Sequence, residues 1–308
     1  MTRIRSALVL ALVLLTAGFS LPAGAAPAVP QARPGTYLAL GDSLTTGYQP
    51  GRGDAVHRGY VGPVAAGMAR RGQPVRIRNL ACTGETTQTM IEGGRCTYRQ
   101  GSQLAAARAA LARDRSTRLI TLTIGANDVR RCLQGTQINA PCTQRTLRQT
   151  RARLEVILGS LREAAPQAQI VVLDYYNPYL ATHLLGNEGR LVAASSTLLH
   201  TQLNSAVRNA ATGAGGSVAY VSSGFNSTSF RYTRLSTWGR VPVRVAQICT
   251  LTWMCNAADI HPNDTGYAVL AAAVLDAVDA RSGQDRVAKR GARADSGSDW
   301  LLRRLKRS

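Results

Sequence analysis

Short apolar runs alternate with longer amphipathic stretches along most of the chain, and this alternation restricts the possible folds more than any other feature of the sequence. Five of the runs have the length and apolar content of buried strands: Thr36–Leu40, Val75–Leu80, Leu119–Ile124, Ile170–Leu173 and Val218–Val221. Strands that alternate with helices of ten or more residues form a parallel sheet covered by helices on both faces. Because such crossovers are right-handed, the pattern predicts a doubly wound α/β fold, a three-layer α/β/α sandwich around a mostly parallel five-stranded sheet.

Amphipathic stretches between and after these runs have apolar residues at helical spacing. The helices predicted from this spacing are Tyr60–Arg70, Gln103–Ala112, Arg145–Ala164, Gly189–Ala211 and Thr265–Ala280. Glycine or proline follows several of them and marks their ends. Because no internal repeat and no long linker interrupts these elements, we predict a single domain over residues 35–281.

Residues 1–25 have the form of a secretory signal peptide. Two arginines precede an apolar run over residues 7–19, and an Ala-Gly-Ala sequence at residues 23–25 supplies the small side chains of a cleavage site. The apolar run is short for a membrane span, although an uncleaved anchor is the alternative interpretation. We therefore expect a secreted protein, with residues 26–34 forming a flexible lead-in to the domain.

The formal net charge of the chain is +20, and nearly all of its basic residues are arginine. A charge of this size favours attraction to anionic lipids or polymers at low ionic strength. Only 5% of the residues are aromatic, and no zinc finger or RNP-type motif is present. The composition therefore argues against a nucleic-acid partner. As a separate expectation, we predict that the protein is a monomer.

Residues 282–308 form a basic terminal segment that we predict to be a disordered tail, because few apolar residues precede Trp300. Trp300, Leu301, Leu302 and Leu305 then lie among arginine and lysine residues. An amphipathic element this short is not stable as an isolated helix. We predict that it supports, at most, weak association with an anionic lipid surface or a cell-wall polymer.

The six cysteines lie in three close pairs outside the signal sequence. An even number of cysteines in an exported chain indicates disulfides, and six cysteines allow 15 connectivities. Pairing of nearest neighbours is the simplest of these, and it gives Cys82–Cys96, Cys132–Cys142 and Cys249–Cys255. The spacings do not fit a structural zinc site, and we predict neither a metal nor a cofactor.

Polar residues with catalytic potential follow three of the predicted strands and precede the last predicted helix. The four segments are Gly41-Asp42-Ser43, Ala81-Cys82-Thr83-Gly84, Gly125-Ala126-Asn127-Asp128 and Asp259-Ile260-His261-Pro262-Asn263. Taken alone, Ser43 is equally well explained as part of a helix cap, although ligands of open α/β sheets bind at this end of the strands. Together, a serine, a glycine-containing turn, an asparagine and a histidine supply the nucleophile, the base and the oxyanion donors of acyl transfer.

These four segments, in this order, resemble the SGNH/GDSL family of hydrolases, in particular its secreted, disulfide-containing actinobacterial esterases and lipases. The resemblance covers residues 36–275 and implies the same α/β/α, flavodoxin-like fold. It implies that Ser43 is the nucleophile and that His261 is the general base. It also implies an oxyanion hole formed by the backbone N–H groups of Ser43 and Gly84 and by the side chain of Asn127. The α/β-hydrolase alternative fails because no G-x-S-x-G elbow surrounds Ser43.

The sequence departs from the usual family pattern at the acidic member of the triad. That pattern has an acid three residues before the histidine, but Ala258 occupies this position and Asp259 lies only two residues before His261. Asp259 is our predicted partner of the histidine ring, reached through a tighter turn. A main-chain carbonyl of residues 256–258 is the alternative.

These observations predict a secreted serine esterase or lipase that acts on a lipid or another carboxylic ester through an acyl-enzyme. An acyltransferase and a carbohydrate O-deacetylase are alternatives that use the same catalytic groups. A non-enzymatic module that binds polyanions is the alternative from a different class, and intact catalytic segments argue against it. The place of the enzyme would be in lipid metabolism.

Three segments without clear periodicity are the predicted walls of the substrate cleft: Arg130–Thr143, Asn177–Gly189 and Ser222–Asn256. Long irregular segments in a compact domain often have such a role. The remaining histidines, His57, His183 and His200, lack partners at metal-binding spacing. We expect these three to be surface or loop residues without a catalytic role.

Overall fold

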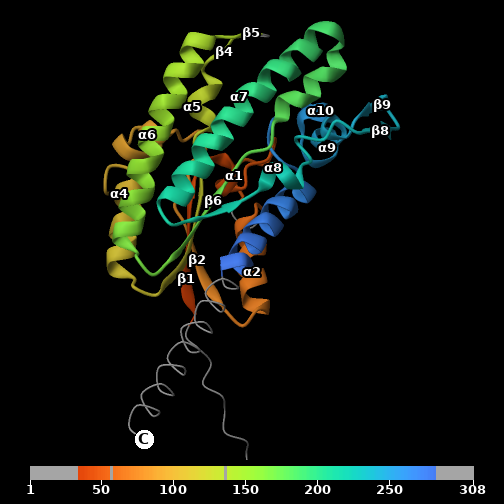
Figure 1. Cartoon of the computed structure of the whole chain (residues 1–308). Helices are drawn as coiled ribbons and strands as arrows, with labels where there is room; N and C mark the ends of the chain where they lie inside the picture. The colour runs from red at the N-terminus through yellow and green to blue at the C-terminus, as the bar shows by residue number, and fades with distance from the viewer. Residues whose placement is uncertain (1–33, 56–57, 135–136, 282–308) are drawn as a thin grey trace, which may run out of the picture. The chain divides into compact units, whose positions relative to one another are not determined.

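The computed structural model describes residues 34–55, 58–134 and 137–281, and a parallel five-stranded sheet lies at its centre (Figure 1). The strands are β1 (Gly35–Gly41), β2 (Val75–Asn79), β3 (Thr117–Thr123), β6 (Gln169–Leu173) and β7 (Ser217–Ala219), in the order β2-β1-β3-β6-β7. The predicted three-layer α/β/α fold is therefore confirmed. The predicted signal peptide and basic tail lie outside the described residues.

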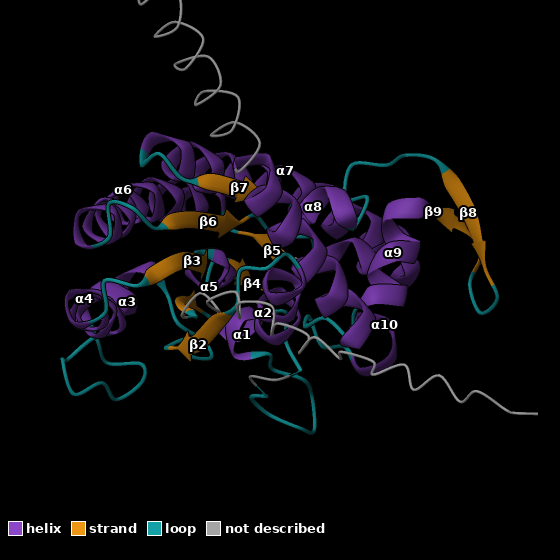
Figure 2. Ribbon diagram, turned by 90° about the horizontal axis from the view of Figure 1, so that it is seen from below, coloured by secondary structure: helices purple, strands orange, loops and turns teal. Residues whose placement is uncertain are grey.

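Helices cover both faces of this sheet (Figures 1 and 2). On one face, α2 (Val61–Arg70) packs beside the helix over residues 264–281, and an ion pair of 2.9 Å between Arg71 and Asp279 joins them. The other face is covered by α4 (Gln103–Arg113), α6 (Ala140–Ala164) and α7 (Gly186–Gly213), which contact one another in sequence order. None of the helices in the described ranges is long and apolar enough to cross a membrane.

Several element boundaries differ from the prediction by one to five residues, and two of these differences have an identifiable local reason. Helix α6 begins at Ala140 rather than Arg145, because the side chain of Asn139 accepts a hydrogen bond from the backbone N–H of Cys142 and caps the helix. Strand β7 ends at Ala219 rather than Val221, because α8 (Val221–Gly224) begins there. The buried carboxylate of Asp174 fixes this turn by accepting hydrogen bonds from the backbone N–H and the hydroxyl of Ser222, both at 2.8 Å.

The segment Ser222–Asn256, predicted as an irregular loop, contains four short elements. They are β8 (Tyr232–Leu235), β9 (Gly239–Pro242), α9 (Val243–Leu251) and α10 (Met254–Ala257). Strands β8 and β9 form an antiparallel hairpin, and α9 buries its apolar side chains against the rest of the domain. Each element is too short to produce a clear period in the sequence, which explains the wrong prediction.

All three predicted disulfides are present. The Cα–Cα distances are 6.1 Å for Cys82–Cys96, 5.5 Å for Cys132–Cys142 and 5.0 Å for Cys249–Cys255. The first closes the chain after β2, and the last joins α9 to α10. Each bridge therefore closes a short segment outside the sheet and restrains it.

The strand order reverses between β1 and β3, and this topological switch point lies beneath the four polar segments. The chains that leave the two strands diverge into α1 (Ser43–Thr46) and α5 (Ala126–Arg130). Strands β1 and β3 are paired up to their ends, where Gly41 lies opposite Thr123. A crevice at the carboxyl ends of such strands is the usual ligand site of open α/β sheets.

Replacement of Gly41 by alanine tests how closely β1 and β3 approach at this point. A Cβ atom on Gly41 would lie 1.9 Å from the carbonyl oxygen of Thr123, at a φ of +124°. Backbone strain and overpacking together predict a loss of about 4 kcal/mol in the free energy of unfolding, measured by urea denaturation. Gly72→Ala is the matched control, because Gly72 has a φ of +72° but open space around its Cβ position. Equal losses in the two variants would contradict the proposed close approach.

Candidate active site

Ser43 is the first residue of α1, and only Asp42 separates it from the end of β1. Asp42 caps this helix, with its Oδ1 accepting a hydrogen bond of 3.0 Å from the backbone N–H of Leu44. Because Asp42 performs the capping, the hydroxyl of Ser43 is free to bond elsewhere. Its Oγ lies 2.8 Å from Nε2 of His261.

His261 lies in the loop between α10 and the helix over residues 264–281. Its Nδ1 is 2.8 Å from Oδ1 of Asp259, and the same oxygen accepts a hydrogen bond of 2.9 Å from the backbone N–H of His261. Ala258 has a left-handed conformation with a φ of 51°, which turns the chain sharply before Asp259. This tight turn brings an acid only two residues from the histidine to its ring.

Aromatic side chains and a backbone bridge hold this loop in place. The backbone N–H of Trp253 donates to the carbonyl of His261 at 3.0 Å, and the hydroxyl of Tyr176 donates to the carbonyl of Ile260 at 2.5 Å. The ring of Tyr48 lies 4.5 Å from the His261 ring, between centroids. The imidazole is therefore fixed in orientation by its carboxylate partner and by the chain on both sides.

The environment of His261 favours a neutral imidazole. Burial lowers its pKa from the ordinary value of 6.5, and the hydrogen bond and negative charge of Asp259 oppose this effect. The charge of Arg130 adds to the lowering. A neutral ring that touches a serine hydroxyl is in the state that a general base requires.

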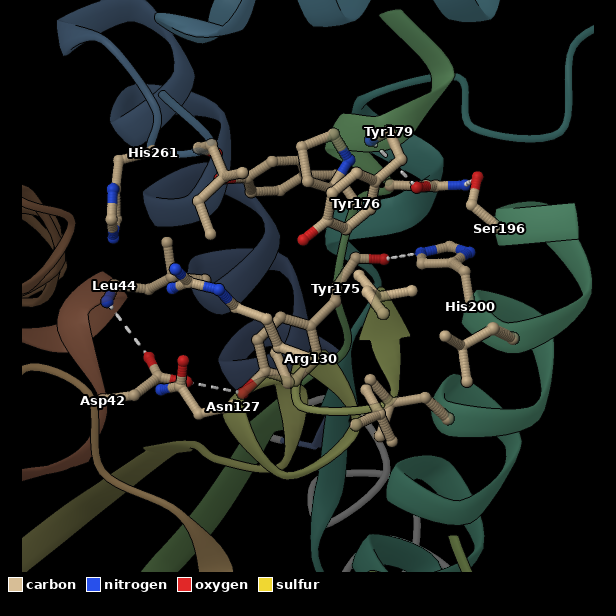
Figure 3. A pocket seen from close by; sticks show the side chains of 18 of the residues that line it. Asp42, Leu44, Asn127, Arg130, Tyr175, Tyr176, Tyr179, Ser196, His200 and His261 are labelled. Carbon is tan, nitrogen blue, oxygen red and sulfur yellow. Dashed lines mark hydrogen bonds between the residues drawn. The ribbon is translucent and has the colours of Figure 1, made fainter. Parts of the chain in front are cut away.

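A buried carboxylate network anchors the start of α1. Asp42 accepts a hydrogen bond of 2.8 Å from the hydroxyl of Tyr175, besides the one from Leu44 (Figure 3). The hydroxyl of Thr123 donates a third, at 2.9 Å. These donors come from three different parts of the fold: the segment after β6, strand β3 and α1. Burial nevertheless raises the pKa of Asp42 from 3.8 to about 6, because desolvation outweighs the three hydrogen bonds.

The predicted oxyanion donors differ in how closely they approach the serine. Asn127 lines the pocket beside Ser43, and its Nδ2 donates a hydrogen bond of 2.9 Å to the carbonyl of Glu85, which leaves its second N–H available. The backbone N–H of Ser43 is in the first turn of α1, where helix N–H groups lack intrahelical partners. Gly84 does not line the pocket; it has a φ of +81° and lies against Arg95, so its role stays a prediction.

An apolar pocket of about 90 Å³ opens beside Ser43 and His261. Its apolar lining consists of Leu44, Val129, Leu133, Tyr175, Tyr176, Tyr179, Leu199, Leu203 and Ile260. Figure 3 shows the side chain of Arg130 directed from α5 toward Leu44, between His261 and Asn127. The pocket is therefore suited to an apolar chain, with cationic and amide groups near the serine.

Parts of two predicted cleft walls line this pocket, and the third does not. Arg130 and Leu133 come from the first segment and Asn177, Pro178 and Tyr179 from the second, in which η1 (Pro178–Leu185) forms. No residue of Ser222–Asn256 is in the lining, so that segment is not a wall of this pocket. Helices α9 and α10 of that segment contact η1 instead.

His200 is a second correction, because we predicted a surface or loop position for it. It lies on α7 and lines the pocket, where its Nε2 contacts the carbonyl of Tyr175 and lies 3.1 Å from Nδ2 of Asn204. Burial lowers its pKa from 6.5. This placement could not be predicted, since the helical period of α7 alone does not show which neighbour covers each face. His57 lies outside the described residues.

Several residues that position the site were missed at the sequence level. Buried Gln103 donates to the carbonyl of Gly41 at 3.0 Å and to the carboxylate of Glu85 at 2.9 Å, and its Oε1 accepts from the N–H of Gly41 at 2.6 Å. Tyr175 and Tyr176 follow β6 as part of a polar and aromatic run. The position of this run at the end of a strand was the sequence feature that could have indicated these two residues. In the part of the chain that the structure describes, no three His, Cys, Asp or Glu side chains are grouped to hold a metal ion.

A serine, a histidine and a carboxylate thus form a continuous hydrogen-bonded series at the switch point of a parallel α/β sheet, an arrangement that is able to activate the serine hydroxyl. The particular family follows from the sequence: the model of the GDSL-like Lipase/Acylhydrolase family matches residues 39–269, and the chain belongs to this family. Membership implies hydrolase activity.

Solved structures of lipolytic enzymes share the fold. The chain is similar to phospholipase A1 from Streptomyces albidoflavus NA297, with a TM-score of 0.51 and 20% identity over 80% of this chain and 100% of that one. It is also similar to the extracellular lipase from Streptomyces rimosus, with a TM-score of 0.52 and 20% identity over 79% of this chain and 99% of that one. An uncharacterized protein of Bacillus subtilis, YpmR, is 24% identical over 78% of this chain and 80% of its own length.

The raised pKa of Asp42 predicts a pH-dependent stability. Its carboxyl is protonated more readily in the folded chain than in the unfolded chain, so this group's contribution is full below about pH 4 and is lost as the pH rises through about 6. Asp42→Asn lacks this titration. The free energy of unfolding of this variant should therefore rise relative to wild type by roughly 2 to 3 kcal/mol between pH 4 and pH 7.

Urea denaturation at several pH values between 4 and 7 measures this difference. Asp276→Asn, which removes an exposed carboxylate on the helix over residues 264–281, controls for the change in net charge. A constant difference between wild type and Asp42→Asn across this range would contradict the assignment.

Proposed function

We propose that this protein is a secreted serine esterase or lipase that hydrolyses carboxylic esters through an acyl-enzyme intermediate. The observation that carries the proposal is the series Ser43 Oγ, His261 Nε2, His261 Nδ1 and Asp259 Oδ1, with both contacts at 2.8 Å, at an apolar pocket. The hydrogen-bonded series indicates ester hydrolysis in general. The apolar pocket is the feature that favours an ester of a fatty acid.

Acylation begins when His261 removes the proton of the Ser43 hydroxyl as its Oγ attacks the ester carbonyl carbon. The carbonyl oxygen becomes an oxyanion, which the backbone N–H of Ser43 and the side-chain amide of Asn127 stabilise, with Gly84 as the third predicted donor. Protonated His261 then delivers the proton to the leaving alkoxide. The alcohol departs, and the acyl group is attached to Ser43.

Deacylation repeats these steps with water. His261 removes a proton from the water molecule as it attacks the acyl carbon, and then returns the proton to Ser43 as the carboxylic acid leaves. Asp259 keeps the Nδ1 proton in place and stabilises the imidazolium formed in each half-reaction. No step requires a metal or a cofactor.

The character of the pocket supports an acyl chain as its occupant. Leucine and tyrosine side chains line it, and a predominantly apolar lining beside a few polar groups is typical of sites that bind apolar ligands. Extracellular action is supported by the three disulfides, which persist in oxidising compartments, and by the predicted signal peptide. An acyltransferase or an O-deacetylase would use the same groups and differs only in the acceptor or in the acyl chain.

Hydrolysis of aryl esters of increasing chain length by wild type and Ser43→Ala tests the proposal. Each methylene that the pocket buries contributes about 0.8 kcal/mol, so kcat/KM should rise about fourfold per methylene until the pocket is full. Ser43→Ala should reduce kcat by at least about 10⁴-fold.

Ser223→Ala, which removes an exposed hydroxyl on α8, is the matched control and should retain activity. Equal activity of wild type and Ser43→Ala would overturn the mechanism. A preference for acetyl over octanoyl esters would favour the O-deacetylase, and transfer to an added alcohol in preference to water would favour the acyltransferase.

The proposed role of Asp259 predicts how much activity its replacement removes and how the activity depends on pH. Because His261 must be neutral and its pKa is lowered, kcat/KM of the wild type should fall only below pH 6.5. Asp259→Asn should reduce kcat by about 10⁴-fold. Asp259 raises the pKa of His261, so the residual activity of the variant should persist to a lower pH than that of wild type. A loss of only a few-fold would show that a backbone carbonyl is sufficient to orient the ring.

A further inference from the structure

We propose that the β8–β9 hairpin and the start of α9 form a docking surface for the headgroup region of an anionic lipid bilayer. This hairpin surface is defined by Phe230, Arg231, Tyr232, Arg234, Trp238, Arg240 and Arg244. It belongs to the segment that does not line the pocket. The inference does not depend on the catalytic proposal, because it concerns binding to a surface rather than reaction.

The aromatic side chains of the hairpin surface are unusually exposed. Phe230 is 72% exposed, Tyr232 56% and Trp238 45%. Figures 1 and 2 show the hairpin projecting beyond α9, away from the sheet. Large apolar side chains gathered at one projecting site mark an interaction surface, whereas scattered ones do not. Tryptophan and tyrosine in particular favour the boundary between lipid and water.

Arginine side chains surround these rings, and no acid accompanies them. Residues 226–252 contain four arginines and neither aspartate nor glutamate. The guanidinium of Arg240 lies 4.7 Å from the centroid of the Tyr232 ring, and that of Arg244 lies 4.3 Å from the centroid of the Phe230 ring. Within the described ranges, no carboxylate forms an ion pair with these four arginines. The charges of Arg231, Arg234 and Arg240, which are exposed, are therefore available to anionic headgroups, which attract arginine by about 1 kcal/mol per residue.

The hairpin surface is connected to the pocket through packed elements. The hairpin contacts α9, α9 contacts η1, and η1 begins with Pro178 and Tyr179, which line the pocket. Burial, and after it the charges of Arg190 and Arg244, lower the pKa of His183 in η1, so both arginines lie near that residue. Leu185, at the end of η1, is 72% exposed. Cationic and apolar groups thus continue from the hairpin toward the segment that carries the pocket wall.

The combination of rings and cations favours a lipid surface over a soluble polyanion. A polyanion without rings, such as polyphosphate, requires only the positive charges, and exposed aromatic side chains give its binding no matching apolar or stacking contact. A bilayer of anionic lipid satisfies both, because the arginines pair with headgroups while the rings enter the interface. The chemistry of the surface therefore selects the lipid.

Co-sedimentation with vesicles tests the proposal on the full-length protein. The vesicles consist of ether-linked phosphatidylcholine, alone or with ether-linked phosphatidylglycerol, so that no carboxylic ester is present for hydrolysis. Wild type should bind the mixed vesicles at low salt and bind the zwitterionic vesicles at least tenfold more weakly. Replacement of Phe230, Tyr232 and Trp238 by serine, and separately of Arg231, Arg234 and Arg240 by serine, should each reduce partition by about tenfold or more.

A charge-matched control separates the hairpin from the rest of this basic protein. It replaces Arg108, Arg145 and Arg148, exposed residues of α4 and α6, by serine, and it should lose no more than about twofold in partition. Circular dichroism and urea denaturation verify folding of every variant. An equal loss in the control would overturn the proposal in favour of net charge. Polyphosphate binding that depends on the arginines, with vesicle binding unchanged by loss of the aromatic rings, would overturn it in favour of a soluble polyanion.

Discussion

The geometry of the site depends on the buried carboxylate of Asp42. Its hydrogen bonds to the Leu44 N–H, the Thr123 hydroxyl and the Tyr175 hydroxyl join the ends of β1, β3 and β6. Gln103 holds the preceding residue, Gly41, by both of its backbone groups. These hydrogen bonds therefore hold Ser43 in place at the end of the sheet. Water does not compete for them, because all of the groups are buried. The raised pKa of Asp42 is the electrostatic cost of this arrangement.

The regular part of the fold could be predicted because its apolar patterns are long. Strands such as Leu119–Ile124 are buried on both faces and read as continuous apolar runs, and helices such as Arg145–Ala164 show a clear period. The hairpin and α9 could not be predicted, because four- to nine-residue elements are stabilised by contacts with distant parts of the chain. The pocket position of His200 was equally hidden, since it depends on which helix face meets Tyr175.

The site residues divide in the same way. Ser43, Asn127 and His261 are recognisable because each lies in a short polar segment at a strand end or before a helix. The pairing of Asp259 with His261 depends on the left-handed conformation of Ala258, which a sequence does not show for a residue other than glycine. The positioning residues around them were missed, because a buried glutamine or tyrosine has no sequence signature of its own.

The hairpin surface and His261 share one structural support. Helix α9 follows β9 without a break, and the disulfide Cys249–Cys255 ties α9 to α10, from which the turn at Ala258 leads to His261. Trp253, between the two cysteines, donates the hydrogen bond that holds the carbonyl of His261. This continuous, disulfide-bonded link fixes the position of His261 relative to the hairpin, and it requires no conformational change. Docking of the hairpin at a lipid surface would therefore place His261 and the pocket at a fixed distance from that surface.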